Sequence, residues 1–130
     1  VSYDVIAVGG SYAGLSAALA LGRARKRVLV VDAGQRRNRY AHAAHGVLGH
    51  DGRAPEAIVR DARAELAAYP TVELVEGMAG GASPDDGAFA VTLADGTAHA
   101  AARLILATGV TDELPGLPGL REGWGRSVLH

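Results

Sequence analysis

The sequence of 130 residues is 48% hydrophobic and 21% charged, and its formal net charge is −1. This balance is typical of an ordinary folded domain, argues against a disordered or fibrous protein, and gives no sign of nucleic acid or a membrane as a partner. The sequence holds no cysteine, which excludes a disulfide, a zinc–thiolate site or a redox dithiol within these residues.

The length corresponds to one domain. The longest run of apolar and small residues after the first glycines, residues 15–21, is too short to span a membrane and has no basic leader before it. We therefore expect neither a signal peptide nor a transmembrane segment. The lack of cysteine and of an export signal favours the cytoplasm.

The first part of the chain predicts a strand, a helix and a second strand. Residues 3–8 form a short apolar run without alternation, as in strands that are covered on both faces of a parallel sheet. Small and apolar residues then recur at helical spacing from residue 12 to about residue 25. Residues 27–32 predict another buried strand, so the whole is a βαβ unit.

The middle of the chain predicts a loop and a second helix. Residues 33–53 have no period, and an irregular loop of this length inside a domain is usually functional or mobile. The second helix is expected to begin at Pro55 and to stop at Pro70, because the apolar residues between them are three and four positions apart.

Three further strands are expected in the sequences TVELVEG, AFAVTLADG and AARLILATG. The sequence GGASPDDG and the turn at Asp95-Gly96 are expected to connect them. We predict a small β-meander from about Val72 to Ala101 and a buried run from Arg103 to Ala107. The proline- and glycine-containing tail is expected to connect rather than to pack.

The turn between the first strand and the first helix reads GGSYAG, a Gly-x-Ser-x-x-Gly pattern. Gly9 supplies the tight turn, and Gly14 lets the helix lie close to the strand. Ser11 stands where a dinucleotide-binding turn usually has its second glycine; its small side chain narrows the site without closing it and can donate a hydrogen bond to phosphate. The N–H groups that begin the helix are therefore expected to bind a pyrophosphate.

Asp32 follows Gly14 by 18 residues and ends the second strand. A carboxylate at this place accepts hydrogen bonds from the ribose hydroxyls of adenosine and repels a 2′-phosphate, which favours FAD or NAD over NADP. The alternative is that Asp32 only ends the strand and caps the following turn.

Two clusters of polar residues allow more than one interpretation. Seven basic residues against one acid lie between residues 23 and 39, and they either face phosphates or are solvated charges: Arg23, Arg25, Lys26, Arg27, Arg36, Arg37 and Arg39. His42, His45, His50 and Asp51 could bind a metal, but their loop lacks a regular spacing, so we predict no metal site. His50 and Asp51 could instead contact a cofactor ring, act as an acid–base pair, or simply be polar surface residues.

Four stretches together resemble the N-terminal part of a thioredoxin reductase-like pyridine nucleotide-disulfide oxidoreductase, a flavoprotein family. They are DVIAVGGSYAGLSAALALGRA, VLVVDAGQRRNR, HGVLGHDG and LILATGVTDELPGLPG. The Ala-Thr-Gly at residues 107–109, with the Leu-Pro and Pro-Gly pairs after it, resembles the second FAD-contact motif of that family.

The resemblance implies FAD as the cofactor and assigns residues to it. The implied cofactor contacts are Gly9, Gly10, Ser11, Ala13, Gly14, Asp32, Ala33, Arg37, Asn38, Gly46, His50, Asp51, Met78, Ala107, Thr108 and Gly109. Arg37 and Asn38 would lie along the linker between ribitol and phosphates. The backbone of Met78 would lie against adenine, and the segment with His50 and Asp51 would lie near the isoalloxazine.

The fold class that follows is α/β, a Rossmann-like FAD-binding three-layer fold with a parallel sheet and a small β-meander. Residues 1–120 are expected to be the FAD-binding domain, as the first segment of a larger enzyme, and residues 121–130 a connection toward an NAD(P)H domain. The alternative is a reduced relative of the family that works differently. Family members also carry a later Gly-Asp motif and in many cases a Cys-x-x-Cys, and neither lies in this sequence. No catalytic residue can therefore be assigned.

The implied activity moves electrons between NAD(P)H, FAD and a disulfide or dithiol, in a protein or a small molecule. NAD(P)H is expected only for the full-length enzyme, which the resemblance implies is a homodimer. The alternative is a non-catalytic module that binds FAD, NAD or ADP. An NAD-dependent dehydrogenase fragment is disfavoured, because the Ala-Thr-Gly strand fits the flavin family better.

Overall fold

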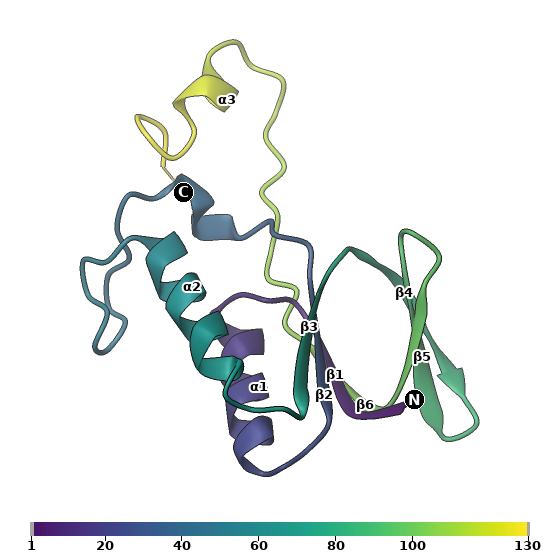
Figure 1. Cartoon of the computed structure of the whole chain (residues 1–130). Coiled ribbons are helices and arrows are strands. Elements are labelled where there is room, and N and C mark those ends of the chain that lie inside the picture. The colour runs from purple at the N-terminus through teal and green to yellow at the C-terminus, as the bar shows by residue number, and fades with distance from the viewer. Residues whose placement is uncertain (1, 130) are drawn as a thin grey trace.

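The computed structural model describes residues 2–129, apart from the side chain of residue 85. A six-stranded sheet runs through the molecule in the order β3-β2-β1-β6-β5-β4 (Figure 1). The strands are β1 (Ser2–Val8), β2 (Val28–Asp32), β3 (Val72–Glu76), β4 (Ala79–Asp85), β5 (Ala88–Leu93) and β6 (Ala98–Leu106). Strands β3, β2, β1 and β6 are parallel, whereas β6, β5 and β4 pair antiparallel.

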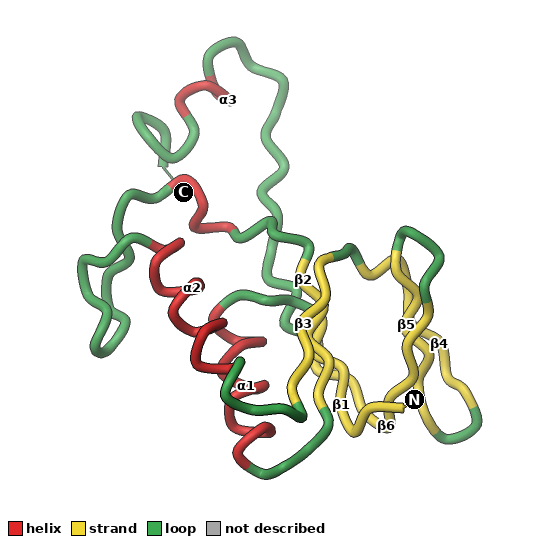
Figure 2. The backbone as a smooth tube through the Cα atoms, in the orientation of Figure 1, coloured by secondary structure: helices red, strands yellow, loops and turns green. Residues whose placement is uncertain are grey.

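Two helices, α1 (Tyr12–Arg23) and α2 (Pro55–Leu66), pack together on one face of the parallel strands (Figure 2). The helices bury Leu15, Ala18 and Val59 against β-strand side chains such as Val30. The small residues of α1 let it lie close to the sheet, since Ala18 is fully buried. The side chains buried between the helices and this face form the first of two hydrophobic clusters.

The antiparallel strands cover the opposite face. Strand β5 contributes Val91 and Leu93 to a second hydrophobic cluster with Leu29 and Val31 of β2. In Figure 1, β4 and β5 stand opposite β2 and β3 across this cluster. Successive residues of β2 point to opposite faces, so both clusters draw on it and all of its residues are buried. The expected α/β fold of three layers with a parallel sheet is confirmed.

The predicted extent of the β-meander is wrong at its start, where the first strand expected in it lies outside it and the first connection expected in it is a strand. Strand β3 pairs in parallel with β2 and is an edge of the main sheet, so the meander consists of β4, β5 and β6. The sequence GGASPDDG, expected to be a connection, forms most of β4. Its glycines and Pro84 have low strand propensity, but an edge strand needs only one paired side, and β5 supplies it. Asp86 and Gly87 make the actual turn, with φ of 42° and 78°.

The predicted buried run from Arg103 to Ala107 is also wrong. Arg103 is exposed, Leu104 and Ile105 are half-buried, and Leu106 is 74% exposed. Leu104 packs at the margin of one hydrophobic cluster and Ile105 at the margin of the other. Within residues 2–129 helix α1 packs against β1 and β2, and α2 packs against α1, which leaves this end of β6 partly uncovered.

The helices are slightly shorter than expected, and the connecting segments contain short turns of helix. Helix α1 stops at Arg23, and α2 ends at Leu66, before Pro70. The loop after β2 contains a 3₁₀ helix, η1 (Arg37–Tyr40), and the tail contains α3 (Leu120–Gly123). The tail arches back toward η1 (Figure 1), and Gly125 packs against Tyr40. No helix among residues 2–129 is both long enough and apolar enough to cross a membrane.

Candidate nucleotide-binding site

A cleft of about 360 Å³ opens at the edge of the sheet where the parallel strands end. Open parallel sheets bind ligands at this edge, because the loops that follow neighbouring strands meet there. The predicted contacts that line it are Gly9, Gly10, Ser11, Asp32, Ala33, Arg37, Asn38, Met78, Ala107, Thr108 and Gly109. Segments about 100 residues apart along the chain thus form one site.

The glycine turn shapes the floor of the cleft by bringing backbone segments close together. Gly9 has a φ of 118°, and a Cβ on it would lie 2.1 Å from the carbonyl oxygen of Ala107. A Cβ on Gly14 would lie 1.7 Å from the carbonyl oxygen of Gly9. Only glycine fits either position, as expected for a turn that lets the helix, the first strand and the last strand approach one another.

Helix α1 begins at this turn, and its first backbone N–H groups have no acceptor within the helix. Ser11 is its N-cap, in an extended conformation and without a side-chain capping bond. The first N–H groups of a helix have no partner within it, and the positive end of the helix dipole lies there. The first turn of α1 carries no acidic residue. The Ser11 hydroxyl and the N–H groups of this turn can therefore bind an anionic diphosphate.

Asp32 stands beside the glycine turn and is only 6% exposed. A Cβ on Gly10 would lie 2.4 Å from Asp32 Cβ, so the glycine provides the space for this side chain. Asp32 Oδ1 accepts a hydrogen bond from the Gly34 N–H at 2.9 Å, and Oδ2 accepts one from Arg63. Asp32 does cap the following turn, but its two oxygens have about four acceptor sites. Acceptor capacity remains for ribose hydroxyls.

Two buried polar atoms on residues that line the cleft have no hydrogen-bond partner in the part of the chain that the structure describes. They are Asn38 Oδ1 and Arg36 Nε. Asn38 Nδ2 donates to the Tyr12 hydroxyl at 3.1 Å, and Arg36 Nη2 donates to Glu56 at 2.7 Å. Buried polar atoms are nearly always paired, so these two atoms fit a cleft that takes a polar ligand.

Arg36 was not among the predicted contacts, although it lines the cleft and its side chain is 14% exposed. The signal in the sequence was the basic cluster to which Arg36 belongs. The neighbouring residues in the sequence do not predict that the Arg36 side chain points in a different direction from that of Arg37.

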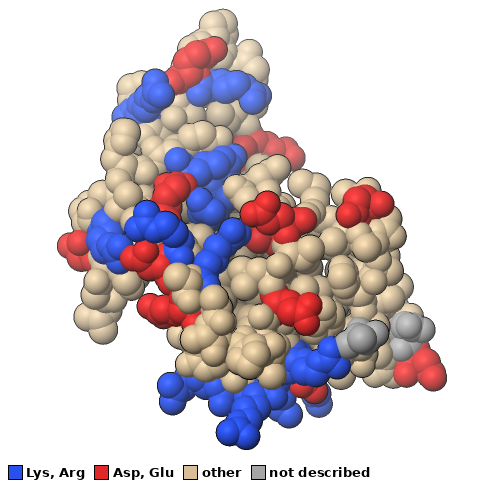
Figure 3. Space-filling model, in the orientation of Figure 1, with Lys and Arg blue, Asp and Glu red and all other residues tan. Residues whose placement is uncertain are grey.

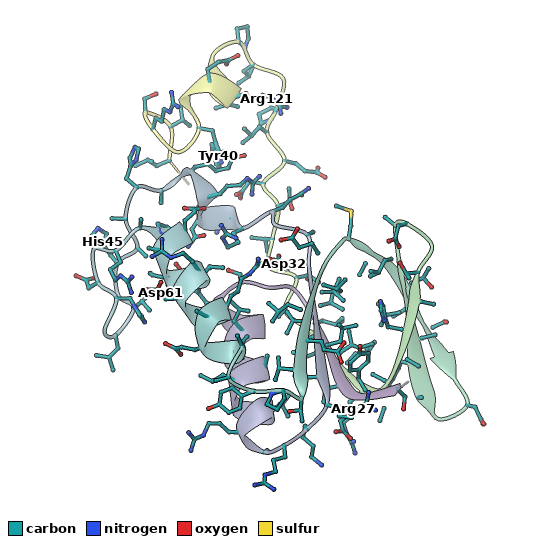
Figure 4. The ribbon with its side chains drawn as sticks, in the orientation of Figure 1. Arg27, Asp32, Tyr40, His45, Asp61 and Arg121 are labelled. Carbon is teal, nitrogen blue, oxygen red and sulfur yellow. The ribbon has the colours of Figure 1, made fainter. Side chains whose placement is uncertain are left out.

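Arg37 joins the loop after β2 to the tail after β6. Its Nε and Nη2 donate to the two oxygens of Asp112, both at 2.9 Å, and these bonds raise the pKa of Arg37 above its ordinary value. A second cavity of about 630 Å³ lies on this pair and is also lined by Tyr40, Arg121 and Trp124. Figure 4 shows Tyr40 and Arg121 on the two segments that face each other there.

The remaining predicted contacts do not line the cleft. Ala13 and Gly14 lie within α1, behind the turn. Gly46, His50 and Asp51 lie in the loop before α2. Figure 4 places His45, from the same loop, beyond α2, whereas Asp32 lies on the strand side of that helix. A contact of these residues with FAD stays a prediction.

The loop before α2 is held by its own polar contacts. The Gly46 N–H donates to Asp51 Oδ1 at 2.8 Å and, with a smaller contribution from His45, lowers the pKa of Asp51 below its ordinary value. Arg53 lies 3.0 Å from His50 Nδ1. No group of three potential ligand residues among residues 2–129 could hold a metal ion.

The basic segment is divided between the two ends of β2. Arg23, Arg25, Lys26 and Arg27 are exposed where α1 ends and β2 begins, and basic side chains gather at that end, at the bottom of Figure 3. Arg36 and Arg37 follow β2 and line the cleft. Only the second group can face a ligand in the cleft.

Comparisons with known proteins agree with this geometry. Residues 3–129 match the family of pyridine nucleotide-disulphide oxidoreductases. The chain is 35% identical to a probable thioredoxin reductase of Arthroderma benhamiae, over 97% of this chain and 33% of the relative. It is 40% identical to the thioredoxin reductase aclD of Aspergillus oryzae, over 98% of this chain and 41% of the relative.

Solved structures give the same result. The oxidoreductase from Agrobacterium tumefaciens is 56% identical and superposes with a TM-score of 0.91 over 97% of this chain and 43% of that one. The chain thus spans 33% to 41% of the length of the relatives that it matches by sequence. The Rossmann-like character of the expected fold is confirmed by this similarity.

Proposed function

This chain belongs to the pyridine nucleotide-disulphide oxidoreductase family, and from that premise we propose that it is the FAD-binding segment of a thioredoxin reductase-like enzyme. The cleft at the end of β1 and β2 is the observation that carries the proposal. It combines a glycine turn, the start of a helix and a buried carboxylate at the end of the next strand. These are the parts that an adenosine diphosphate group requires.

The residues present fit the ADP part of FAD. Gly9 and Gly10 add no side chain to the turn before α1, and the unpaired Asn38 Oδ1 and Arg36 Nε offer polar contacts along the cleft. Ser11 and the N–H groups of the turn would hold the diphosphate, and Asp32 would hold the ribose. The backbone near Met78 and the Ala107–Gly109 segment would enclose the rest. When bound, FAD supplies hydride and electron transfer.

This chain's own residues bind and orient the cofactor. The positive end of α1 stabilises the diphosphate, and Asp32 fixes the sugar by accepting its hydroxyl protons in hydrogen bonds. Arg37 and Asp112 tie the two segments that border the second cavity, which limits how far these segments can separate. No residue of this sequence is proposed as a redox nucleophile.

The activity of the whole enzyme is proposed from the relatives. We infer that electrons pass between NAD(P)H, FAD and a disulfide or dithiol, in a protein or small-molecule partner. The longer protein would carry the NAD(P)H domain after residue 120 and act as a homodimer. A cytoplasmic location stays a prediction from composition.

Binding of FAD to the purified chain tests the proposal. We expect a flavin absorption spectrum and quenching of flavin fluorescence, and at least a tenfold weaker dissociation constant for Asp32→Ala, because a charge-assisted hydrogen bond is lost. Asp95→Asn is the control, since Asp95 lies in the β5–β6 turn and bonds only locally to Thr97. A chain that binds ADP or NAD but no FAD would instead favour the non-catalytic module.

A further inference from the structure

Arg63 extends from the last turn of α2 to the carboxylate at the end of β2. Its Nη2 donates to Asp32 Oδ2, and its Nη1 lies 3.6 Å from Glu76 Oε1 at the end of β3. Helix α2 contributes no other residue to either cavity that borders Asp32. The contact therefore links a helix outside the cleft to the residue that we propose binds ribose.

A smaller cavity of about 260 Å³ adjoins the main cleft at this ion pair. The two cavities share Asp32, Ala33, Gly77 and Met78, and Arg63 and Glu76 line only the smaller one. A substituent on the ribose that Asp32 holds would meet Arg63 where it extends into the smaller cavity, because Arg63 is the cationic residue that lines this cavity.

Charge decides what this cavity accepts. One guanidinium faces two carboxylates, of which Asp32 is 6% exposed and Glu76 88% exposed. A phosphate on the ribose would add about −1.5 to −2 charges against this excess of negative charge. A ribose with free hydroxyls needs only acceptor atoms, which Asp32 provides.

We propose that the Asp32–Arg63 pair sets the nucleotide selectivity of the cleft, with Arg63 as a positioning residue. Together with the Gly34 N–H, Arg63 fixes both carboxylate oxygens of Asp32, so that their remaining acceptor sites are preset for ribose hydroxyls. Removal of the Asp32 charge turns Arg63 into a cation that binds a 2′-phosphate. Its Nε, buried and without a partner among residues 2–129, is a further donor for it. This inference rests on the proposed nucleotide-binding function.

Calorimetric titration with two ligands tests the inference. ADP-ribose and 2′-phospho-ADP-ribose differ only in the 2′-phosphate, so the ratio of their dissociation constants measures selectivity at this position. The variants are Asp32→Asn, Arg63→Gln, the double variant and Arg63→Lys. Arg60→Gln is the matched control, since Arg60 lies on the same helix, is 74% exposed and lines neither cavity.

The parent chain is expected to prefer ADP-ribose at least tenfold. Asp32→Asn is expected to reduce that preference by about tenfold or more, the effect of one charge-assisted contact, because it binds the 2′-phospho ligand more tightly than the parent does. The double variant, which also lacks Arg63, is expected to lose this added affinity for the 2′-phospho ligand. Arg63→Gln weakens ADP-ribose without improving its 2′-phospho form, Arg63→Lys restores part of the affinity, and Arg60→Gln matches the parent.

Different results overturn different statements. Equal ratios in Asp32→Asn and the double variant would show that Arg63 does not sense the 2′-position and would overturn the inference alone. An unchanged affinity for ADP-ribose in Arg63→Gln would show that Arg63 does not position Asp32 and would also overturn it. A folded parent chain that binds neither ligand would overturn the proposed function and the inference together.

Discussion

The absence of a side chain at three glycines is as important to the shape of the cleft as the side chains that line it. Gly9, Gly10 and Gly14 each stand where a Cβ would overlap a neighbouring atom, and in the case of Gly10 that neighbour is Asp32 itself. The turn thus sets the distance between the start of α1 and the Asp32 carboxylate. A change of one methyl group at these positions affects folding and binding together.

Gly14→Ala tests this coupling. Alanine is favoured over glycine inside a helix by about 1 kcal/mol, but overpacking against the Gly9 carbonyl costs about 3 kcal/mol. We expect the free energy of unfolding to fall by about 2 kcal/mol in urea denaturation, with weaker FAD binding. Gly116→Ala, whose Cβ would meet nothing within 4 Å, should change little. Equal or greater stability of Gly14→Ala would contradict the close approach.

Among the elements, helix α2 packs in the core with one face and holds the preceding loop with the other. Its apolar face buries Ile58, Val59 and Leu66. Its polar face is joined to the loop before it, since Arg36 contacts Glu56 at 2.7 Å and Arg53 contacts Asp61 at 2.5 Å. The helix therefore holds the irregular loop and, through Arg63, the edge of the cleft.

These ion pairs predict a specific sensitivity to acid. Hydrogen bonds from Arg36 and Arg53 lower the pKa values of Glu56 and Asp61 below their ordinary values of 4.5 and 3.8. A lowered pKa in the folded state stabilises the protein above the ordinary pKa, and this stabilisation is lost as the pH falls through the folded value. The melting temperature of the parent should thus fall more steeply below pH 4.5 than that of Glu56→Gln/Asp61→Asn.

Glu65→Gln is the control for this measurement, since Glu65 lies on the same helix and forms no ion pair among residues 2–129. Its melting curves should follow those of the parent at every pH. Parallel acid profiles for the parent and the double variant would show that the pairs contribute nothing in solution, as exposed ion pairs often do.

At the scale of the whole molecule, the cleft holds more of the residues predicted to contact adenosine diphosphate than of those predicted to contact the isoalloxazine. The glycine turn, Asp32 and Asn38 meet in one cleft, whereas His50 and Asp51 lie outside it. The chain covers 43% of the Agrobacterium tumefaciens oxidoreductase, and the outer end of β6 leaves Leu106 74% exposed. The site as it stands has few contacts for an isoalloxazine.

We therefore expect the 130-residue chain to retain FAD weakly. Gel filtration of the chain loaded with FAD, followed by the ratio of flavin to protein absorbance, should give well under one flavin per chain. A longer protein that contains the same residues should retain more, because further segments would enclose the ring. Stoichiometric retention by this chain would contradict the expectation.

The predictable parts of the fold are those with a local signal. A few neighbouring residues are enough to predict β2 from its unalternating run, the glycine turn from its pattern, and α2 from its apolar spacing. The position of Asp32 in the cleft is predicted by its place at the end of β2. Strand β4 was missed because glycine, serine and proline predict turns, and only the ladder with β5 makes them a strand. Arg36 and Arg63 were missed because arginine is common on surfaces and its direction has no sequence signal.

The amino-acid sequence alone determines the βαβ unit, the turn that can hold a diphosphate and the carboxylate that can hold a ribose, since spacing and the size of glycine act over short stretches of chain. The tertiary structure decides that β3 pairs with β2, that β6 lies between β1 and β5, and that Arg63 meets Asp32 from 31 residues away. Such pairings depend on how helices and strands pack, because a contact between distant residues exists only once both elements are in place.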